Sequence, residues 1–324
     1  MSKIISFSIP CYNESENIIP LTEELIHMFS VGELKNYCCS IEFIDNKSTD
    51  GTREKLKYLA DKYPQYVKAI FNARNFGGVS NFYGLLQTKG DCTIVIPCDF
   101  QVPLSIIPEL ISKWNAGAKI VCAVKKKSKE NFFMWQIRKI YYSLIKKFSS
   151  IQQIEHFTGA GLYDSSFIKW LKILNDPLPS LRGMVVEYGY KIEQVTYTEE
   201  KRKSGKSKHN FISLFDVAIK NVISYTHLLP HLATFLGMTL SVLSVIVGVV
   251  YLILKLIYWN DFSSGIAPIL FGVFFIGGIQ LAFLGFFGEY LMVINQRLLN
   301  RPLVIEEERL NFNIEEKDDE ICKN

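Results

Sequence analysis

Hydrophobic and polar positions alternate in blocks along the first 125 residues. Short apolar runs, typical of buried strands, are separated by longer stretches with helical periodicity. Strands that alternate with helices favour βαβ units and a mostly parallel sheet, so we predict an α/β fold. The expected strands are 4–9, 40–44, 67–71, 92–96 and 119–124, and the expected helices lie near 14–29, 50–63, 76–88 and 104–116.

The last third of the chain has a different pattern. Leu232–Leu254 contains 23 residues without a charge, and Phe262–Gly288 contains 27. At about 1.5 Å per residue, each stretch is long enough to cross the roughly 30 Å hydrocarbon core of a bilayer, so we predict two transmembrane helices. The predicted division is a soluble domain at 1–209, a juxtamembrane helix at 210–230, transmembrane helices at 231–257 and 263–295, and a charged tail at 300–324.

Basic residues lie on one side of both predicted transmembrane helices. Five lysines and arginines fall within 201–208, and Arg297 and Arg301 follow the second helix, whereas the connection between the helices carries only Lys255 and Asp261. The positive-inside rule therefore predicts a multi-pass protein with its soluble domain and both termini in the cytoplasm. The net charge of +4 is mild and does not indicate a nucleic-acid partner.

A basic amphipathic stretch covers 131–148, where apolar residues recur at helical spacing among lysines and arginines. One interpretation is an interfacial helix that lies on the membrane surface. The other is a helix packed on the sheet with its basic residues in solvent. The transmembrane helices favour the first interpretation, because they hold the soluble domain against the bilayer.

Polar clusters follow three of the expected strands: PCYNE at 10–14, DNKSTDGT at 45–52 and PCDFQ at 97–101. In open α/β sheets, ligands bind beyond the carboxyl ends of the strands. We therefore expect the three clusters to converge on one edge of the sheet and to form a binding site. Asn13 and Glu16 also have the spacing of a capping box for the first helix.

These clusters occur in the order of a known family. IPCYNE, IDNKSTDGT, RNFGG at 74–78, CDFQVP, KRKSGKSKHN at 201–210 and RPLVIEE at 301–307 resemble the motifs of family-2 glycosyltransferases. The chain most resembles the polyprenyl-phosphate group, which includes dolichyl-phosphate mannose synthases and the bacterial enzymes that charge undecaprenyl phosphate. The resemblance covers nearly the whole chain. It implies a GT-A (Rossmann-like) domain, a nucleotide-sugar donor, a lipid-phosphate acceptor and Mg²⁺ or Mn²⁺.

The resemblance implies a metal site at Asp99 and Gln101. They match the second Asp and the Gln of the family's D-x-D-x-Q motif, while Pro97 replaces the first Asp and Val102 replaces a later one. A single carboxylate is compatible with Mg²⁺, which keeps waters and uses few protein ligands. The alternative is that Asp99 is a turn residue in a weakened or inactive site.

The resemblance also implies a nucleotide site. Asp45 matches the first Asp of D-D-G-S-x-D-G-T, the usual contact for the base or ribose, while Asn46 and Lys47 replace the second Asp and the glycine. The alternative for Asn13 is a structural role in the turn between strand and helix. Arg74 is either a nucleotide contact or a surface arginine. The predicted nucleotide-binding residues are Pro10, Tyr12, Asn13, Glu14, Asp45 and Arg74.

A basic segment before the first transmembrane helix matches the family's R-x-x-G-x-S-K. The resemblance implies phosphate contacts from Arg202, Ser207 and Lys208, with Arg202 and Lys208 acting in catalysis beside Asp99. The alternative is a polybasic segment attracted to anionic lipid, and the two roles are compatible. Glu199 stands where the family has an arginine.

The shortage of candidate general bases favours the phosphate acceptor that the resemblance implies. Ala160 and Gly161 lie where many relatives carry an acidic residue, and Asp164 is expected to cap the next helix. A phosphate acceptor is already anionic near neutral pH and needs no strong base.

We therefore expect a metal-dependent, inverting transferase of the inner membrane, a tetramer by family analogy. It would move one sugar from a UDP-sugar to undecaprenyl or a related polyprenyl phosphate, for modification of surface polysaccharide or lipid. The alternatives are a transferase acting on a lipid-linked sugar and a catalytically degenerate homologue that serves as a binding partner.

Overall fold

The computed structural model describes residues 2–32, 34–126, 154–199, 228–258, 266–299 and 301–312. The chain forms two compact units. The first comprises Met1–Lys139, Ile151–His209 and Asn300–Asn324, and the second comprises Ile140–Ser150 and Asn210–Leu299. The α/β domain predicted from the sequence is the first unit, and the second contains two long helices.

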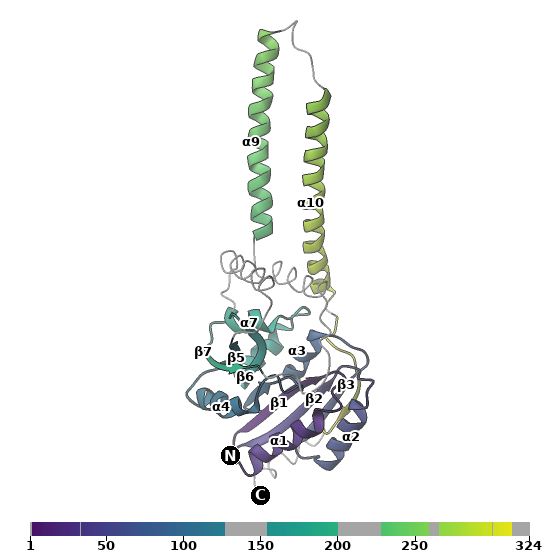
Figure 1. The fold of residues 1–324 in the computed structure, drawn as a ribbon, viewed down its shortest axis with the longest axis vertical. Helices are drawn as coiled ribbons and strands as arrows, with labels where there is room; N and C mark the ends of the chain where they lie inside the picture. The colour runs from purple at the N-terminus through teal and green to yellow at the C-terminus, as the bar shows by residue number, and fades with distance from the viewer. Residues whose placement is uncertain are drawn as a thin grey trace. The chain divides into compact units, whose positions relative to one another are not determined.

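A mostly parallel sheet forms the centre of the first unit (Figure 1). Its strands are β1 (Ile4–Cys11), β2 (Cys38–Asp45), β3 (Val67–Asn72), β4 (Cys92–Val95), β5 (Ile120–Lys126), β6 (Phe157–Asp164), β7 (Ile192–Thr198) and β8 (Glu306–Leu310). Their order in the described residues is β7-β5-β6-β4-β1-β2-β3-β8. Strands β3, β2, β1 and β4 are parallel, β6 runs antiparallel between β4 and β5, and β7 is parallel to β5. The predicted α/β class is confirmed.

Helices cover both faces of this sheet. They are α1 (Ile18–Ser30), α2 (Thr52–Lys62), α3 (Gly78–Gln87), the 3-10 turn η1 (Leu104–Ile106), α4 (Ile107–Asn115), α6 (Ser165–Leu174) and α7 (Leu181–Glu187). Leu21, Leu56 and Leu110 bring α1, α2 and α4 into one core cluster with β1. Phe82 and Phe167 bring α3 and α6 into a second cluster, which also includes α7 residues. Strands buried on both faces read as continuous apolar runs, which is why the sequence pattern located them.

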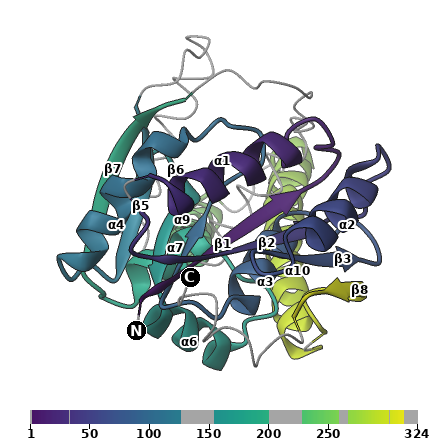
Figure 2. The ribbon, with the colours of Figure 1, turned by 90° about the horizontal axis from the view of Figure 1, so that it is seen from below.

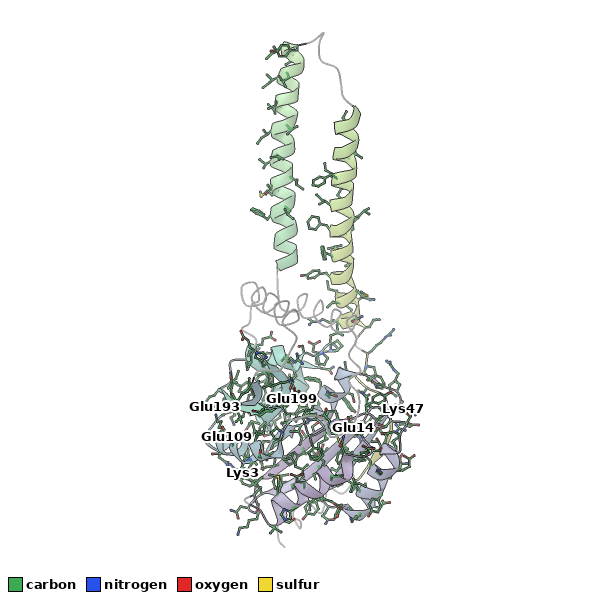
Figure 3. The ribbon with its side chains drawn as sticks, viewed as in Figure 1. Lys3, Glu14, Lys47, Glu109, Glu193 and Glu199 are labelled. Atoms are coloured by element: carbon green, nitrogen blue, oxygen red, sulfur yellow. The ribbon has the colours of Figure 1, made fainter. Side chains whose placement is uncertain are left out.

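The second unit contains α9 (Leu228–Ile257) and α10 (Ile266–Leu298), whose described side chains are largely apolar and exposed (Figure 3). Each predicted transmembrane stretch overlaps one of these helices. Within the described part of the chain, Phe275–Leu298 is the stretch that is long and apolar enough to cross a bilayer by length and composition. Both transmembrane helices, predicted at 231–257 and 263–295, stay predictions, and α10 contains the candidate span.

Strand β8 was not foreseen by the sequence analysis, which assigned 300–324 to a tail. It pairs antiparallel with β3, with Leu310 opposite Ala69, and Figure 2 shows it in yellow at the edge of the sheet. Its sequence, EEERL, lacks apolar alternation because an edge strand carries charged residues on its open side. The chain therefore returns to the α/β unit after α10.

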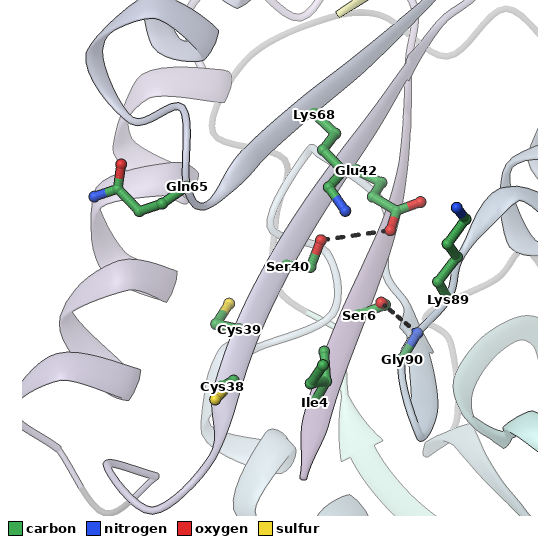
Figure 4. A pocket seen from close by; sticks show the side chains of 10 residues that line it. All are labelled: Ile4, Ser6, Cys38, Cys39, Ser40, Glu42, Gln65, Lys68, Lys89 and Gly90. Carbon is green, nitrogen blue, oxygen red and sulfur yellow. Dashed lines mark hydrogen bonds between the residues drawn. The ribbon is translucent and has the colours of Figure 1, made fainter. Parts of the chain in front are cut away.

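A buried carboxylate lies on β2, in a part of the sheet away from the polar strand ends. Glu42 is 1% exposed, and within the described residues its Oε2 has no hydrogen-bond partner, while Ser40 Oγ donates to Oε1 at 3.4 Å. Glu42 lines a cavity of about 30 Å³ together with Lys68 and Lys89 (Figure 4). Burial raises the pKa of Glu42 from 4.5 to about 7, and the nearby charge of Lys68 opposes this shift.

The raised pKa of Glu42 predicts a pH-dependent stability. The folded state binds the proton of Glu42 more tightly than the unfolded state does. The contribution of this proton to the unfolding free energy is therefore fully present below pH 4.5 and is lost as the pH rises through about 7. We expect Glu42→Gln to reduce the fall in unfolding free energy between pH 5 and pH 8 by about 2 kcal/mol, measured by chemical denaturation of the full chain in detergent. Glu109→Gln, at an exposed position of α4, should keep the wild-type dependence. An equal pH dependence of the unfolding free energy in Glu42→Gln and the wild type would contradict the raised pKa of Glu42.

Candidate functional site

The three polar clusters leave the sheet at the same edge, as predicted. In the parallel register of β1 and β2, Cys11 lies opposite Asp45, so the two strands end together. Strand β4 is the other neighbour of β1, with Val95 opposite Ser8, and the 97–101 cluster follows it. The loops after β1, β2 and β4 therefore begin side by side at the carboxyl edge.

Two buried thiols lie among the acidic residues of this edge. Burial raises the pKa of Cys11 well above its usual value, and the neighbouring Cys98, Asp45 and Glu14 raise it further. Burial likewise raises the pKa of Cys98, with further contributions from Glu14 and Asp99. Asp45 closes β2, and Glu14 and Asp99 lie on the loops after β1 and β4, so all three carboxylates belong to this edge of the sheet.

Asp45 is enclosed and charge-paired. Its side chain has no exposed surface, and Arg53 Nε donates to its Oδ2 at 2.7 Å. Ser48 N donates to both carboxylate oxygens at 3.2 Å. A buried carboxylate stays charged only with such partners. The sequence analysis missed Arg53, whose position in the first turn of α2, the helix that follows the cluster, was the available signal.

Asn46 organises the loop that carries Arg74. Asn46 Oδ1 accepts hydrogen bonds from Phe76 N at 2.9 Å and from Asn72 Nδ2 at 3.3 Å, while Asn46 Nδ2 donates to Gly77 O at 3.3 Å. Arg74 is exposed on this loop, with its guanidinium 4.3 Å from the centre of the Phe76 ring. Asn46, which stands in place of a family Asp, therefore fixes the loop after β3 against the loop after β2.

The loop after β1 is tied to the loop after β2 through Asn13. Asn13 has a φ of 58°, a left-handed conformation, and its Oδ1 accepts from Thr49 N at 2.8 Å. Its own N–H donates to Ser48 Oγ at 2.9 Å. The predicted capping box is wrong, because α1 begins at Ile18 and the Asn13 oxygen is used by the neighbouring loop.

Pro10, near the end of β1, and Tyr12 and Glu14, in the loop after it, are half-buried. Glu14 N donates to Thr52 Oγ1 at 2.9 Å, and Asn17 Nδ2 donates to Glu14 Oε2 at 2.6 Å. The loop is thus held at both its backbone and its side chains. The structure brings these predicted residues to the same edge as Asp45.

Asp99 lies in a strained turn. It is 4% exposed, and its Oδ1 accepts from Gln101 N at 3.2 Å across Phe100, whose φ is 59°. A bulky residue with positive φ is uncommon and is tolerated where the surroundings require that turn.

The oxygen ligands of this turn fit a hard divalent cation. No cluster of three or more His, Cys, Asp or Glu side chains suited to a metal occurs among the residues that the structure describes. A cation held by Asp99 and Gln101 would complete its coordination with oxygens of a bound ligand and water, which is the usual arrangement for Mg²⁺.

The departures from the family pattern have structural counterparts. Lys47 has a φ of 65°, so it keeps the left-handed backbone that suits the glycine it replaces. A Cβ at Gly161 would lie 2.3 Å from Val121 O, so β6 has no room for a side chain there. Glu199 forms an ion pair with Lys125.

Asp164 caps α6, as predicted, through a hydrogen bond from Ser166 N at 3.0 Å. Arg202, Ser207 and Lys208, together with the stretches 131–148 and 210–227, lie outside the described residues, so their roles stay predictions.

Comparison with known proteins places the chain in a family. Residues 6–170 match the family described as glycosyl transferase family 2. The SfII prophage-derived bactoprenol glucosyl transferase of Shigella flexneri is 31% identical over 93% of this chain and 96% of its own length. The putative glycosyltransferase CsbB of Bacillus subtilis is 30% identical over 92% of this chain and 90% of its own. The chain therefore belongs to glycosyl transferase family 2.

A solved structure with a similar chain is the glucosyl-3-phosphoglycerate synthase of Mycobacterium tuberculosis in complex with Mn²⁺, uridine diphosphate and phosphoglyceric acid. It is 16% identical, with a TM-score of 0.42, and the match covers 68% of this chain and 76% of that one. This similarity is too low to transfer any contact.

The contacts of Asn46 predict the effect of restoring the family's acidic residue. Asn46→Asp removes the donor to Gly77 O and places a second negative charge beside Asp45. We expect the unfolding free energy to fall by about 1–3 kcal/mol, measured by chemical denaturation. Asn75→Asp, in the loop after β3, keeps its acceptor for Gly77 N and should stay near the wild type. Equal stability of the two variants would show that Asn46 does not organise the loop.

Proposed function

We propose that this protein transfers one sugar from a nucleotide-sugar donor, a UDP-sugar, to undecaprenyl phosphate or a related polyprenyl phosphate. Membership of glycosyl transferase family 2 supports the reaction class. The similar Shigella proteins, named bactoprenol glucosyl transferases, support the lipid acceptor. The observation that carries the proposal is the convergence of Asp45, Glu14 and Asp99 at the carboxyl edge of β1, β2 and β4.

The loops at this edge would receive the nucleoside. In the proposal, Pro10, Tyr12, Asn13 and Glu14 border the base, and Asp45 accepts a hydrogen bond from the base or ribose. Because Asp45 has no exposed surface, such a contact requires the neighbouring Ser48 to shift when the donor binds, while Arg53 keeps its place. Arg74, exposed on the neighbouring loop, is a further contact for the nucleotide.

Asp99 and Gln101 would hold the divalent cation. When bound, Mg²⁺ or Mn²⁺ neutralises the charge that develops on the departing diphosphate. Arg202, Ser207 and Lys208 are proposed as phosphate contacts, since guanidinium and ammonium groups bind phosphate oxygens strongly.

The acceptor phosphate would attack the anomeric carbon directly. The bond to the departing diphosphate breaks as the new bond forms, which inverts the configuration. The acceptor is already anionic, and β6 presents Ala160 and Gly161 rather than a carboxylate, so the site has no need of a general base there.

The membrane arrangement is part of the proposal. We infer that α9 and α10 both span the inner membrane, with 131–148 and 210–230 at its surface and with the α/β unit and both termini in the cytoplasm. The apolar composition of α10 and the basic residues flanking the two helices support this arrangement. The tetramer rests on family resemblance alone.

The proposed transfer is tested with membranes that contain the full chain. They are incubated with a panel of radiolabelled nucleotide sugars, undecaprenyl phosphate and Mn²⁺, and label is counted in the extracted lipid. We expect one UDP-sugar to label the lipid and Asp99→Asn to lower the rate on the order of 100-fold, because loss of metal stabilisation costs several kcal/mol. Asp61→Asn, at an exposed position of α2, is the matched control and should keep the wild-type rate.

Two results would contradict this proposal. Undiminished transfer by Asp99→Asn would remove the metal role of Asp99. Absence of labelled lipid with every donor would overturn the transfer itself and favour the degenerate homologue that only binds.

A further inference from the structure

Glu307 of β8 connects the C-terminal strand to the loop after β2. Its Oε2 accepts hydrogen bonds from Arg53 Nη1 and from Lys47 Nζ, each at 2.8 Å. Both cations belong to the segment 45–53, which begins at Asp45 and ends in the first turn of α2. A residue that follows α10 in the chain therefore contacts a loop assigned to the donor nucleotide.

Arg53 transmits this contact to Asp45. Besides the bond from Nη1 to Glu307, its Nε donates to Asp45 Oδ2 and its Nη2 donates to Asn72 O, both at 2.7 Å. The guanidinium is planar and its donors have fixed directions, so three partners in its plane define one orientation. The Asp45–Arg53 pair is shielded from solvent, while Glu307 is 46% exposed. An exposed ion pair adds little stability, so the contact of Glu307 acts mainly on the geometry of Arg53.

The bulge in β8 directs Glu307 toward this loop. Phe71 of β3 lies opposite Glu308, and Asn72 lies opposite Glu306, so Glu307 is the extra residue of a β-bulge. A bulge leaves one residue outside the regular pairing and re-aims its side chain. Without the bulge, the side chain of Glu307 would point to one face of the sheet, as the regular alternation along a strand requires.

The rest of β8 is held firmly. Tyr83 Oη donates to Glu306 Oε1 at 2.6 Å, and Arg309 Nη2 donates to Gln87 Oε1 at 2.9 Å, so α3 is tied to the strand at two points. Asn311 Nδ2 donates to Val67 O at 2.9 Å at its far end. The carboxylate of Glu307 thus projects from a fixed strand.

Lys47 gives a second reason to regard this contact as functional. A lysine with a φ of 65° pays a conformational cost that glycine would avoid. Its ammonium group pairs with Glu307 Oε2 at 2.8 Å. The loop thus keeps its left-handed turn and gains a link to β8.

We propose that Glu307 is a positioning residue of the donor site. Through Arg53 and Lys47 it holds the 45–53 loop in the conformation that receives the nucleotide. The inference rests on the proposed function, because it assigns that loop to the nucleotide of the donor.

The test compares two neighbouring residues of the same strand. Glu307→Gln keeps the shape of the side chain and removes its charge. Glu308→Gln is the matched control, since Glu308 pairs with Lys57 Nζ at 2.6 Å on α2. We expect Glu307→Gln to raise KM for the donor roughly 2- to 5-fold, the effect expected from losing a partly exposed ion pair, with kcat unchanged within error. Glu308→Gln should keep both constants, and thermal unfolding should be alike in the two variants.

A double-mutant cycle separates positioning from a general effect on the strand. If Glu307 acts through Arg53, Arg53→Lys combined with Glu307→Gln should raise KM by less than the product of the single effects. Equal KM values in Glu307→Gln and Glu308→Gln, or fully multiplicative effects in the cycle, would overturn the positioning role.

Calorimetric titration with UDP and Mn²⁺ distinguishes this failure from a failure of the proposed function. Absence of transfer by the wild type would overturn the proposed function, and the UDP affinities of the two variants would still decide the role of Glu307. Absence of UDP binding by the wild type would overturn both.

Discussion

The ion pair between Asp45 and Arg53 is the interaction on which the carboxyl edge of the sheet depends. A carboxylate without exposed surface is costly unless a charged partner and hydrogen bonds compensate for its lost hydration. Arg53 supplies that charge, and the same guanidinium reaches Asn72 on β3 and Glu307 on β8. One side chain therefore joins the ends of three strands. The strand ends that carry the surrounding loops are thereby held in place, and the proposed ligand-binding surface consists of these loops.

The departures from the family pattern form contacts of their own. Asn46, in place of an acidic residue, binds the end of β3 by one hydrogen bond and the loop after it by two. Lys47, in place of glycine, keeps the left-handed turn and pairs with Glu307. Glu199, in place of an arginine, pairs with Lys125. Each replacement is therefore accommodated by contacts within the folded domain.

The sequence predicted the elements whose signal is local. Strands β1 to β5 are apolar runs covered on both faces, and the edge where ligands bind follows from the direction of parallel strands. Strand β8 escaped prediction because its charged residues suit an exposed edge. The contact of Arg53 with Glu307 spans 254 residues, so no spacing rule reveals it. The capping box at Asn13 failed because a neighbouring loop uses the same oxygen, a competition visible only in three dimensions.

The central claim is that Asp99 and a nucleotide together hold a divalent cation at this edge. Electron paramagnetic resonance of Mn²⁺ measures it directly, because the signal of the free ion is lost on binding. With wild-type protein and UDP together, we expect the free signal to fall below the level that UDP or protein produces alone. With Asp99→Asn, the signal should match that of UDP without protein. An equal fall in the wild type and Asp99→Asn would contradict the account.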